Sequence, residues 1–246
     1  MEKSTIDIDF ISQGFHLKGI LHLPKIKNPP LVVGSHGLEG SKNSAKQIVL
    51  ANTLIQKDIA FLRFDHRGCG QSQGEFIKDT SLEKRTQDLI DAIKNIISLE
   101  LTCNRVALFG SSMGGATCIN AWGPIKEMKL QLCGMVLCSA PIKSLTIKNI
   151  PTQSNGDRPA LPLSFFAENL IFDLSQKARQ ISNLLVFHGD SDEVVPITNG
   201  YEIYRLAKEP KQLIIHKNGD HQMTCKKDQA DFDQKAANWF SSCLCC

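Results

Sequence analysis

Short apolar runs alternate with longer segments of helical spacing along most of the chain, and this rhythm restricts the folds open to it. A short apolar run bounded by turn residues is typical of a buried strand, and apolar residues three and four apart are typical of a helix. The expected strands are 31–33, 59–64, 105–109, 132–138, 184–187 and 213–215, and the expected helices are 44–57, 82–97, one ending near 122, 198–207 and 229–240. The alternation predicts an α/β fold with a mostly parallel sheet and helices on both faces.

The N-terminal segment departs from this rhythm. Residues 6–10 and 15–23 alternate apolar and polar side chains on either side of Gln13-Gly14, which predicts an antiparallel hairpin. No internal repeat and no low-complexity linker follows, so we expect one domain over residues 1–246.

Residues 140–180 interrupt the alternation. The first part holds Pro141, Pro151, Pro159 and Pro162 without a clear period, and a helical pattern follows Phe165 and Phe166 through 179. Loops longer than about 12–15 residues are uncommon in compact domains unless they cover or form a site. We expect a lid-like insertion over the carboxyl edge of the sheet; a surface excursion between two strands is the alternative.

Composition excludes several classes of protein. The formal charge is +3 and the basic residues are scattered, which argues against a nucleic-acid partner. No apolar run is long enough to span a membrane, and the N-terminus lacks the apolar core of a signal peptide, so a cytoplasmic protein is expected. The oligomeric state stays open, a homodimer included.

The nine cysteines are odd in number and irregular in spacing, which does not indicate a metal site. In a reducing compartment they are expected as free thiols. Four of them have apolar surroundings and are expected as small core residues: Cys103, Cys118, Cys133 and Cys138. The tail Cys243-Leu244-Cys245-Cys246 has the cysteine position of a prenylation box, with a frayed tail as the alternative.

The segment Gly110-Ser111-Ser112-Met113-Gly114-Gly115 leaves the expected strand 105–109 and leads directly into a helix. It is a Gly-x-Ser-x-Gly pattern in the strand–turn–helix context that lifts a serine hydroxyl above a sheet. Glycine is required on both sides because side chains would collide across so tight a turn. The helix N-terminus also favours negative charge beside Ser112. We expect Ser112 to be a nucleophile and Ser111 to be a turn residue.

A serine attacks a carbonyl group when a base accepts its proton and an acid orients that base. His221 follows the expected strand 213–215 and is the candidate base. Asp190 and Asp192 both follow the expected strand 184–187, and either is a candidate for the acid. The remaining histidines lie in the hairpin, in turns or at strand ends, and His188 is expected to pack or hydrogen-bond locally.

Acyl transfer also requires N–H donors for a developing oxyanion. The backbone N–H of Met113, directly after the serine, is one candidate. A second is the N–H of Leu38, in the turn His36-Gly37-Leu38-Glu39-Gly40 that follows the strand 31–33. His36 is expected to brace this turn, with a role as a second base as the alternative.

The ordered set of motifs resembles the α/β-hydrolase superfamily over nearly the whole chain. The motifs are His-Gly-x-x-Gly, Asp-x-Arg-Gly-x-Gly-x-Ser, Gly-x-Ser-x-Gly-Gly, His-Gly-x-x-Asp-x-x-Val-Pro and Gly-x-His. Residues 36–43 and 64–76 are similar to the bacterial feruloyl/cinnamoyl-esterase-like and serine-aminopeptidase-like branch. The resemblance implies Ser112 as nucleophile, His221 as base, and Leu38 and Met113 as oxyanion donors. It also favours Asp192 over Asp190, because the family acid lies four residues before the proline of the Val-Pro pair.

These patterns favour a serine hydrolase that cleaves a small-molecule carboxylic ester and needs no metal or organic cofactor. The apolar insertion suggests a hydrophobic acyl or aryl pocket that includes Phe165 and Phe166. The same residues also suit a thioesterase, an amidase or peptidase, or a C–C hydrolase. A non-catalytic binding protein and a lipid hydrolase anchored through the cysteine tail are further alternatives.

Overall fold

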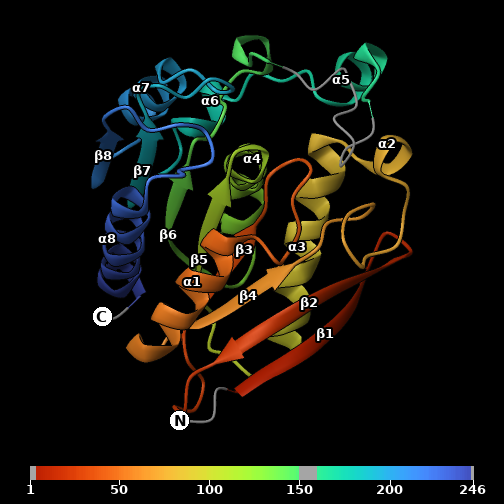
Figure 1. Ribbon diagram of the computed structural model, residues 1–246. Coiled ribbons are helices and arrows are strands. Elements are labelled where there is room, and N and C mark those ends of the chain that lie inside the picture. Colours follow the sequence, from red (N-terminus) through yellow and green to blue (C-terminus); the bar gives the residue numbers. More distant parts are fainter. Residues whose placement is uncertain (1–3, 150–159, 245–246) are drawn as a thin grey trace.

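One sheet organises the structure, in the strand order β1-β2-β4-β3-β5-β6-β7-β8 (Figure 1). The computed structural model describes residues 4–149 and 160–244. The expected hairpin is confirmed: β1 (Ser4–Ser12) and β2 (Phe15–Leu23) are antiparallel, and β2 adds antiparallel to β4. All other pairings are parallel. They join β3 (Leu31–Ser35), β4 (Ala60–Phe64), β5 (Arg105–Ser111), β6 (Gln131–Cys138), β7 (Leu184–Gly189) and β8 (Lys211–His216).

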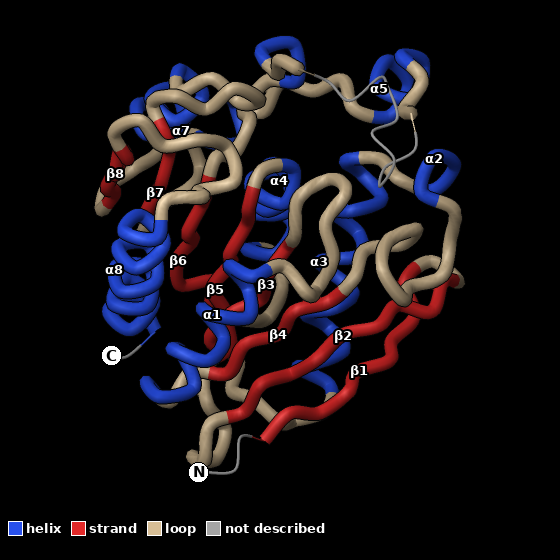
Figure 2. Tube along the Cα trace, viewed as in Figure 1, coloured by secondary structure: helices blue, strands red, loops and turns tan. Residues whose placement is uncertain are grey.

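Helices cover both faces of this sheet, as the alternation predicted (Figure 2). On one face α1 (Ala45–Leu54) packs against α8 (Lys226–Leu244). On the other, α3 (Leu82–Ser98) packs against α4 (Met113–Lys126), and α7 (Thr198–Leu206) lies against β7 and β8. The expected helix 44–57 ends in a 3-10 turn, Ile55–Lys57, and the short α2 (Phe76–Asp79) was not expected.

Each face of the sheet packs against its helices through a separate apolar cluster. Along β5, Val106 and Leu108 belong to the cluster under α3 and α4, whereas Ala107 and Phe109 belong to the cluster under α1 and α8. Successive strand residues point to opposite faces, so a strand covered on both sides must be apolar throughout. This explains why the central strands are continuous apolar runs.

The sequence of α3 explains where this helix begins and which of its faces is buried. The Ser81 hydroxyl accepts a hydrogen bond from the backbone N–H of Lys84 at 3.1 Å and so caps the first turn. Leu82, Leu89 and Ile93 are buried against the sheet, as their spacing predicted. The same buried face also carries Arg85, a charged side chain with no exposure to solvent.

The described parts of the 140–180 insertion lie beyond the carboxyl ends of the parallel strands (Figure 1). They contain the 3-10 turn Ser144–Thr146 and the short helices α5 (Leu163–Asn169) and α6 (Ser175–Ala178). The expected continuous helix through 179 is therefore wrong, because the chain extends at Asp173 and forms a β-bridge with Lys143. Pro151 and Pro159 lie outside the described residues.

Three of the four cysteines expected in the core, Cys118, Cys133 and Cys138, are buried, and Cys103 is half-buried in the turn before β5. Burial raises the pKa of the Cys118 thiol. The helix α8 continues to the buried Leu244, and the last two residues of the cysteine tail lie outside the described part. None of the described helices combines the length and apolar character needed to cross a bilayer.

The first turn of α4 packs so closely on the end of β3 that a side chain cannot fit at Gly114. A Cβ atom there would lie 2.0 Å from the Ser35 carbonyl oxygen. We therefore predict that Gly114→Ala lowers the free energy of unfolding by about 3 kcal/mol or more, since backbone cannot move aside as a side chain can.

Gly123, in the same helix, is the matched control. A Cβ atom there would meet only the Gln180 Oε1 at 3.4 Å. Gly123→Ala should be neutral or stabilising by up to about 1 kcal/mol, because alanine is the better helix former. Urea unfolding monitored by circular dichroism measures both variants, and equal midpoints for the two would contradict the prediction.

Candidate active site

Ser112 stands in the turn between β5 and α4 with an unusual backbone conformation, φ +52° and ψ −124°. Such a conformation costs a non-glycine residue about 1–3 kcal/mol and persists only where the surroundings enforce it. Glycines on both sides permit it: a Cβ atom on Gly110 would lie 2.6 Å from the Gly114 carbonyl oxygen, and one on Gly115 would lie 2.4 Å from the Ala140 Cβ. The turn projects Ser112 beyond the carboxyl edge of the sheet.

Three side chains from three loops meet at this edge. The Ser112 Oγ lies 3.0 Å from the His221 Nε2. The His221 Nδ1 lies 2.9 Å from each carboxylate oxygen of Asp192. Ser112 follows β5, Asp192 follows β7 and His221 follows β8, so parallel strands bring residues from distant parts of the sequence to one edge. A hydroxyl, an imidazole and a carboxylate linked in this way suit nucleophilic acyl transfer.

The Asp192 carboxylate is held by the backbone as well as by His221. Its Oδ1 accepts hydrogen bonds from the N–H groups of Val194, at 3.0 Å, and Val195, at 2.7 Å. Burial opposes ionisation of this carboxyl, but the hydrogen bonds from His221 and from these N–H groups lower its pKa below the usual value. The imidazole therefore faces a fixed negative charge.

Asp190, the other candidate for the acid, points elsewhere. Its Oδ1 accepts a hydrogen bond from the backbone N–H of Asn218 at 2.6 Å and so ties the loop after β7 to the loop after β8. The geometry brings Asp192, and not Asp190, against His221.

The two expected oxyanion donors lie beside the serine. Leu38 and Met113 both line the same cavity as Ser112, and a Cβ atom on Gly37 would lie 3.6 Å from the Ser112 Cβ. Within the described residues, neither the Leu38 nor the Met113 N–H donates to a backbone acceptor. Two N–H groups without a backbone acceptor in the described part of the chain therefore belong to residues that line the cavity beside Ser112.

Two buried histidines support the turn that carries Leu38. The His36 Nδ1–H donates to the Gly37 carbonyl oxygen at 2.7 Å, and its Nε2 accepts from the His66 backbone N–H at 3.1 Å. Burial, together with the nearby positive charge of Arg85, lowers the pKa of His36 well below its ordinary value. Burial lowers the pKa of His66 to about 4. Both rings are therefore neutral near pH 7, and His36 braces the turn as expected.

The other histidines do not contact the serine. All seven lie in the described part of the chain, and only His221 is hydrogen-bonded to Ser112. The His188 Nε2–H donates to the Val195 carbonyl oxygen at 2.8 Å, which agrees with the local role expected for it. His216 pairs with Asp231 at 3.1 Å.

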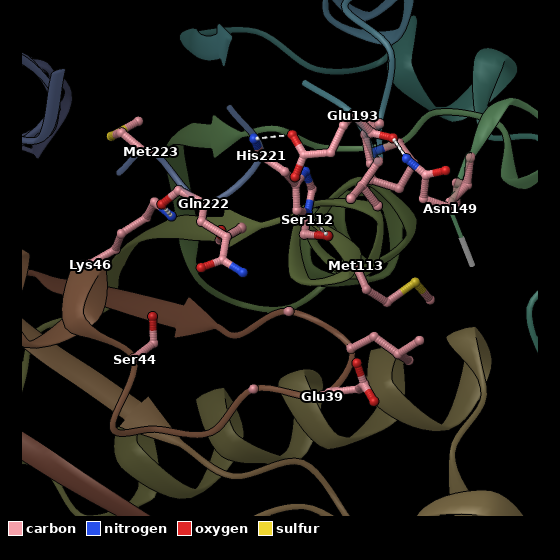
Figure 3. Close-up of a pocket in the computed structure, with 18 of the residues that line it drawn as sticks. Glu39, Ser44, Lys46, Ser112, Met113, Asn149, Glu193, His221, Gln222 and Met223 are labelled. Atoms are coloured by element: carbon pink, nitrogen blue, oxygen red, sulfur yellow. Dashed lines mark hydrogen bonds between the residues drawn. The ribbon is translucent and has the colours of Figure 1, made fainter. Parts of the chain in front are cut away.

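A cavity of about 720 Å³ opens above Ser112 (Figure 3). The insertion contributes an apolar wall that consists of Leu145, Ile147, Phe166, Leu170, Ile171 and Phe172. The opposite wall is more polar and includes Lys46 and Gln222.

Of the two phenylalanines expected at the pocket, only Phe166 lines the cavity. Phe165 is buried in the core, and its ring lies 5.5 Å from that of Phe76 and 5.3 Å from that of Phe166. Adjacent residues of a helix point about 100° apart, so one side chain of such a pair faces inward.

Two polar residues that the sequence reading missed hold the His221 loop (Figure 3). The Glu193 carboxylate accepts the His221 backbone N–H at 3.2 Å, and the Lys46 ammonium donates to the Gln222 carbonyl oxygen at 2.7 Å. In the sequence, only the position of Glu193 next to Asp192 could have indicated that Glu193 belongs to the site. Lys46 is far from His221 in the sequence, so no local pattern indicated its contact with the His221 loop. The described residues gather no set of three or more side chains that could hold a metal ion.

Comparison with known proteins assigns the family. Residues 27–154 match the model of the family described as serine aminopeptidase, S33. The chain belongs to this family. It is 30% identical over 190 residues to the uncharacterized protein YfhR of Escherichia coli (strain K12), a match that covers 77% of this chain and 62% of YfhR. It is 30% identical over 165 residues to thiohydrolase aneE of Aspergillus aculeatus, with coverage of 65% of this chain and 50% of that protein.

The fold agrees with that assignment. The solved structure of Est1E from Butyrivibrio proteoclasticus with bound ferulic acid matches with a TM-score of 0.83 at 19% identity, covering 96% of this chain and 99% of that one. A likeness at this identity shows the fold, which is the expected α/β-hydrolase fold. The chain spans less than two thirds of the length of the two curated relatives named above.

The buried neutral histidines predict that acid weakens the fold. A histidine whose pKa is lower in the folded than in the unfolded state takes up a proton on unfolding, so stability is lost as the pH falls below about 6.5. For His66 the loss continues until the pH reaches its folded pKa of about 4. We expect His66 alone to remove about 1 kcal/mol from the free energy of unfolding near pH 5.5.

Urea unfolding at about pH 7.5 and 5.5 measures this loss, and His66→Gln should show a smaller difference between the two conditions. An unchanged difference in the variant would contradict the prediction.

Proposed function

We propose that the protein is a serine hydrolase that cleaves a carboxylic ester through an acyl-enzyme intermediate. The hydrogen-bonded series from Ser112 through His221 to Asp192 carries this proposal. Membership of a hydrolase family and the unused N–H donors beside the serine support it.

In the first half-reaction the Ser112 Oγ attacks the ester carbonyl carbon while the His221 Nε2 takes the hydroxyl proton. The N–H groups of Leu38 and Met113 bind the oxygen that becomes negative in the tetrahedral intermediate. Collapse of the intermediate breaks the bond to the alcohol, which leaves with the proton from His221. Throughout, Asp192 holds the imidazole in the tautomer with hydrogen on Nδ1 and stabilises its cation.

In the second half-reaction His221 takes a proton from water, and the resulting hydroxide attacks the acyl group on Ser112. The intermediate then releases the carboxylic acid, and the proton returns to the serine oxygen. No group other than these side chains, the backbone donors and water is required.

The walls of the cavity favour an apolar acyl group. On the side of the insertion, Leu145 is 86% exposed and Ile171 is 60% exposed, although both are apolar and line the cavity. Apolar side chains gathered at a concave site are typical of ligand contact. A small or medium acyl chain would shield them from water.

A thioester is the second candidate substrate. The observation that favours it is the match to a relative named thiohydrolase. The chemistry at Ser112 is the same for both substrates, because only the leaving group changes from an alcohol to a thiol. Competition between an ester and a thioester of the same acyl group distinguishes the two.

Hydrolysis of p-nitrophenyl esters from acetate to decanoate tests the proposal. We predict turnover with an optimum at a medium chain length. An acyl chain longer than acetate covers more of the apolar wall, up to the length that the cavity can hold. Ser112→Ala should lower kcat about 1000-fold or more. Ser111→Ala, a change of the neighbouring serine, should stay within about threefold of the unchanged protein. Full activity in the Ser112 variant would refute the assignment.

The two aspartates after β7 provide a second test. Asp192→Asn should lower kcat about 1000- to 10,000-fold, because an amide at this position stabilises the wrong tautomer of His221. Asp190→Asn should cost much less, since Asp190 contacts the backbone of Asn218 rather than the imidazole. Steady-state kinetics on both variants measures the effect. A larger loss in the Asp190 variant would reverse the assignment of the acid.

A further inference from the structure

Arg85 on α3 places a buried positive charge directly beneath the turn that carries Leu38. Its side chain is wholly buried, and its Nη2 donates to the carbonyl oxygens of His36 and, at 3.3 Å, of Gly37. The other guanidinium nitrogens, Nε and Nη1, have no hydrogen-bond acceptor among the described residues. Both of its hydrogen bonds to oxygen acceptors therefore go to one turn, and the Cys69 thiol lies beside it.

Arg67, one of two other arginines buried in the described part of the chain, is bound differently. Its Nε and Nη2 bind the Asp88 Oδ1 at 2.9 Å and 2.6 Å, and its remaining bonds go to Gln13 and Ser12. A buried charge with a carboxylate partner recovers part of its desolvation cost, whereas one bonded to neutral carbonyls recovers less. Arg85 therefore lacks the direct carboxylate hydrogen bonds that Arg67 has, although the charge of Asp88 also acts on it.

The geometry of the peptide bond links Arg85 to the catalytic cavity. A trans peptide group is planar, and its C=O and N–H point in opposite directions. The Gly37 carbonyl and the Leu38 N–H belong to one such group. Arg85 and the His36 Nδ1–H both bind that carbonyl oxygen. The Gly40 backbone N–H donates to the same oxygen at 3.2 Å, so three donors on the carbonyl side set the direction of the Leu38 N–H on the other side.

The positive charge adds an electronic effect. A cation at a carbonyl oxygen draws electron density from the amide, which makes its N–H a stronger donor. The benefit is greatest when the N–H meets a full negative charge, which happens in the tetrahedral intermediate and not in the bound ester.

We propose that Arg85 is a positioning residue that orients and polarises the Gly37–Leu38 peptide as an oxyanion donor. The inference rests on the proposed function, since it assigns a task within that reaction. It differs from an oxyanion donor itself, because Arg85 acts from beneath the turn and does not touch the substrate.

Kinetics of Arg85→Met and Arg85→Lys, with Arg67→Lys as the matched control, test the inference. Removal of one oxyanion donor lowers kcat about 100- to 1000-fold, so misdirection of one should cost about 10- to 100-fold in the Met variant. The Lys variant keeps the charge but not the fork of donors, and we expect a smaller loss of about 3- to 10-fold. KM should stay within about twofold in both, because the ground-state carbonyl needs the donor least.

Inhibition by a phenylboronic acid gives a readout that a purely structural role would not move. The boronate forms a negatively charged tetrahedral adduct on serine, so its inhibition constant should rise in the Arg85 variants in parallel with the loss of kcat. Arg67→Lys should lower the urea midpoint while leaving kcat and the boronate affinity near those of the unchanged protein.

The outcomes separate the inference from the function on which it rests. Folded Arg85 variants with kcat within about threefold and unchanged boronate inhibition would overturn the inference alone. A loss of activity in which KM rises and the boronate affinity stays the same would also overturn the inference alone. If the Met variant does not fold, the Lys variant decides by the same criteria. Absence of Ser112-dependent turnover in the unchanged protein would overturn both.

Discussion

The close contact between the start of α4 and the end of β3 is the central structural constraint, because it holds the backbone turn at Ser112. A serine with φ +52° is held there because α4 begins within van der Waals contact of the end of β3, with glycines at the points of closest approach. Apolar clusters on both faces of the sheet fix β3 and β5 side by side and thereby enforce the contact. The packing of the core thus maintains a strained backbone at Ser112, and strain of this kind is typical of functional sites.

Beneath the cavity lies a layer of buried polar groups that an ordinary core would exclude. His36, His66 and Arg85 all have almost no exposure to solvent, and their hydrogen bonds converge on the turn after β3. Such a layer costs stability, particularly in acid. It also binds the carbonyl oxygens of His36 and Gly37, and under the proposed function this directs the N–H of Leu38 to the cavity. Preorganised donors stabilise developing charge best because they need no rearrangement during the reaction.

The cavity combines residues at the ends of the sheet strands with a wall contributed by the insertion. Ser112, Asp192 and His221 stand on loops after β5, β7 and β8, where the sheet determines their positions. The apolar wall comes from the insertion between β6 and β7, which the sheet does not restrain in the same way. A fold of this kind carries many activities by changing such loops. Under the proposed function, the residues at the strand ends set the reaction type, and the insertion sets the substrate preference.

Local patterns in the sequence predicted the strands, most of the helices, the hairpin and the turn at Ser112, because each is encoded by local periodicity or by glycines within a few positions. Local patterns did not distinguish Asp190 from Asp192; motif resemblance was needed, and the structure separates them by a backbone bond to Asn218. Only the tertiary structure decided that Phe166 and not Phe165 faces the cavity, because the direction of a side chain on a short helix depends on what the helix packs against. Arg85 lies on the apolar face of α3, three residues after Leu82 and four before Leu89, a signal visible in the sequence. Its partners belong to a turn far away in the chain, and contacts of that kind exist only once the sheet has brought the two segments together.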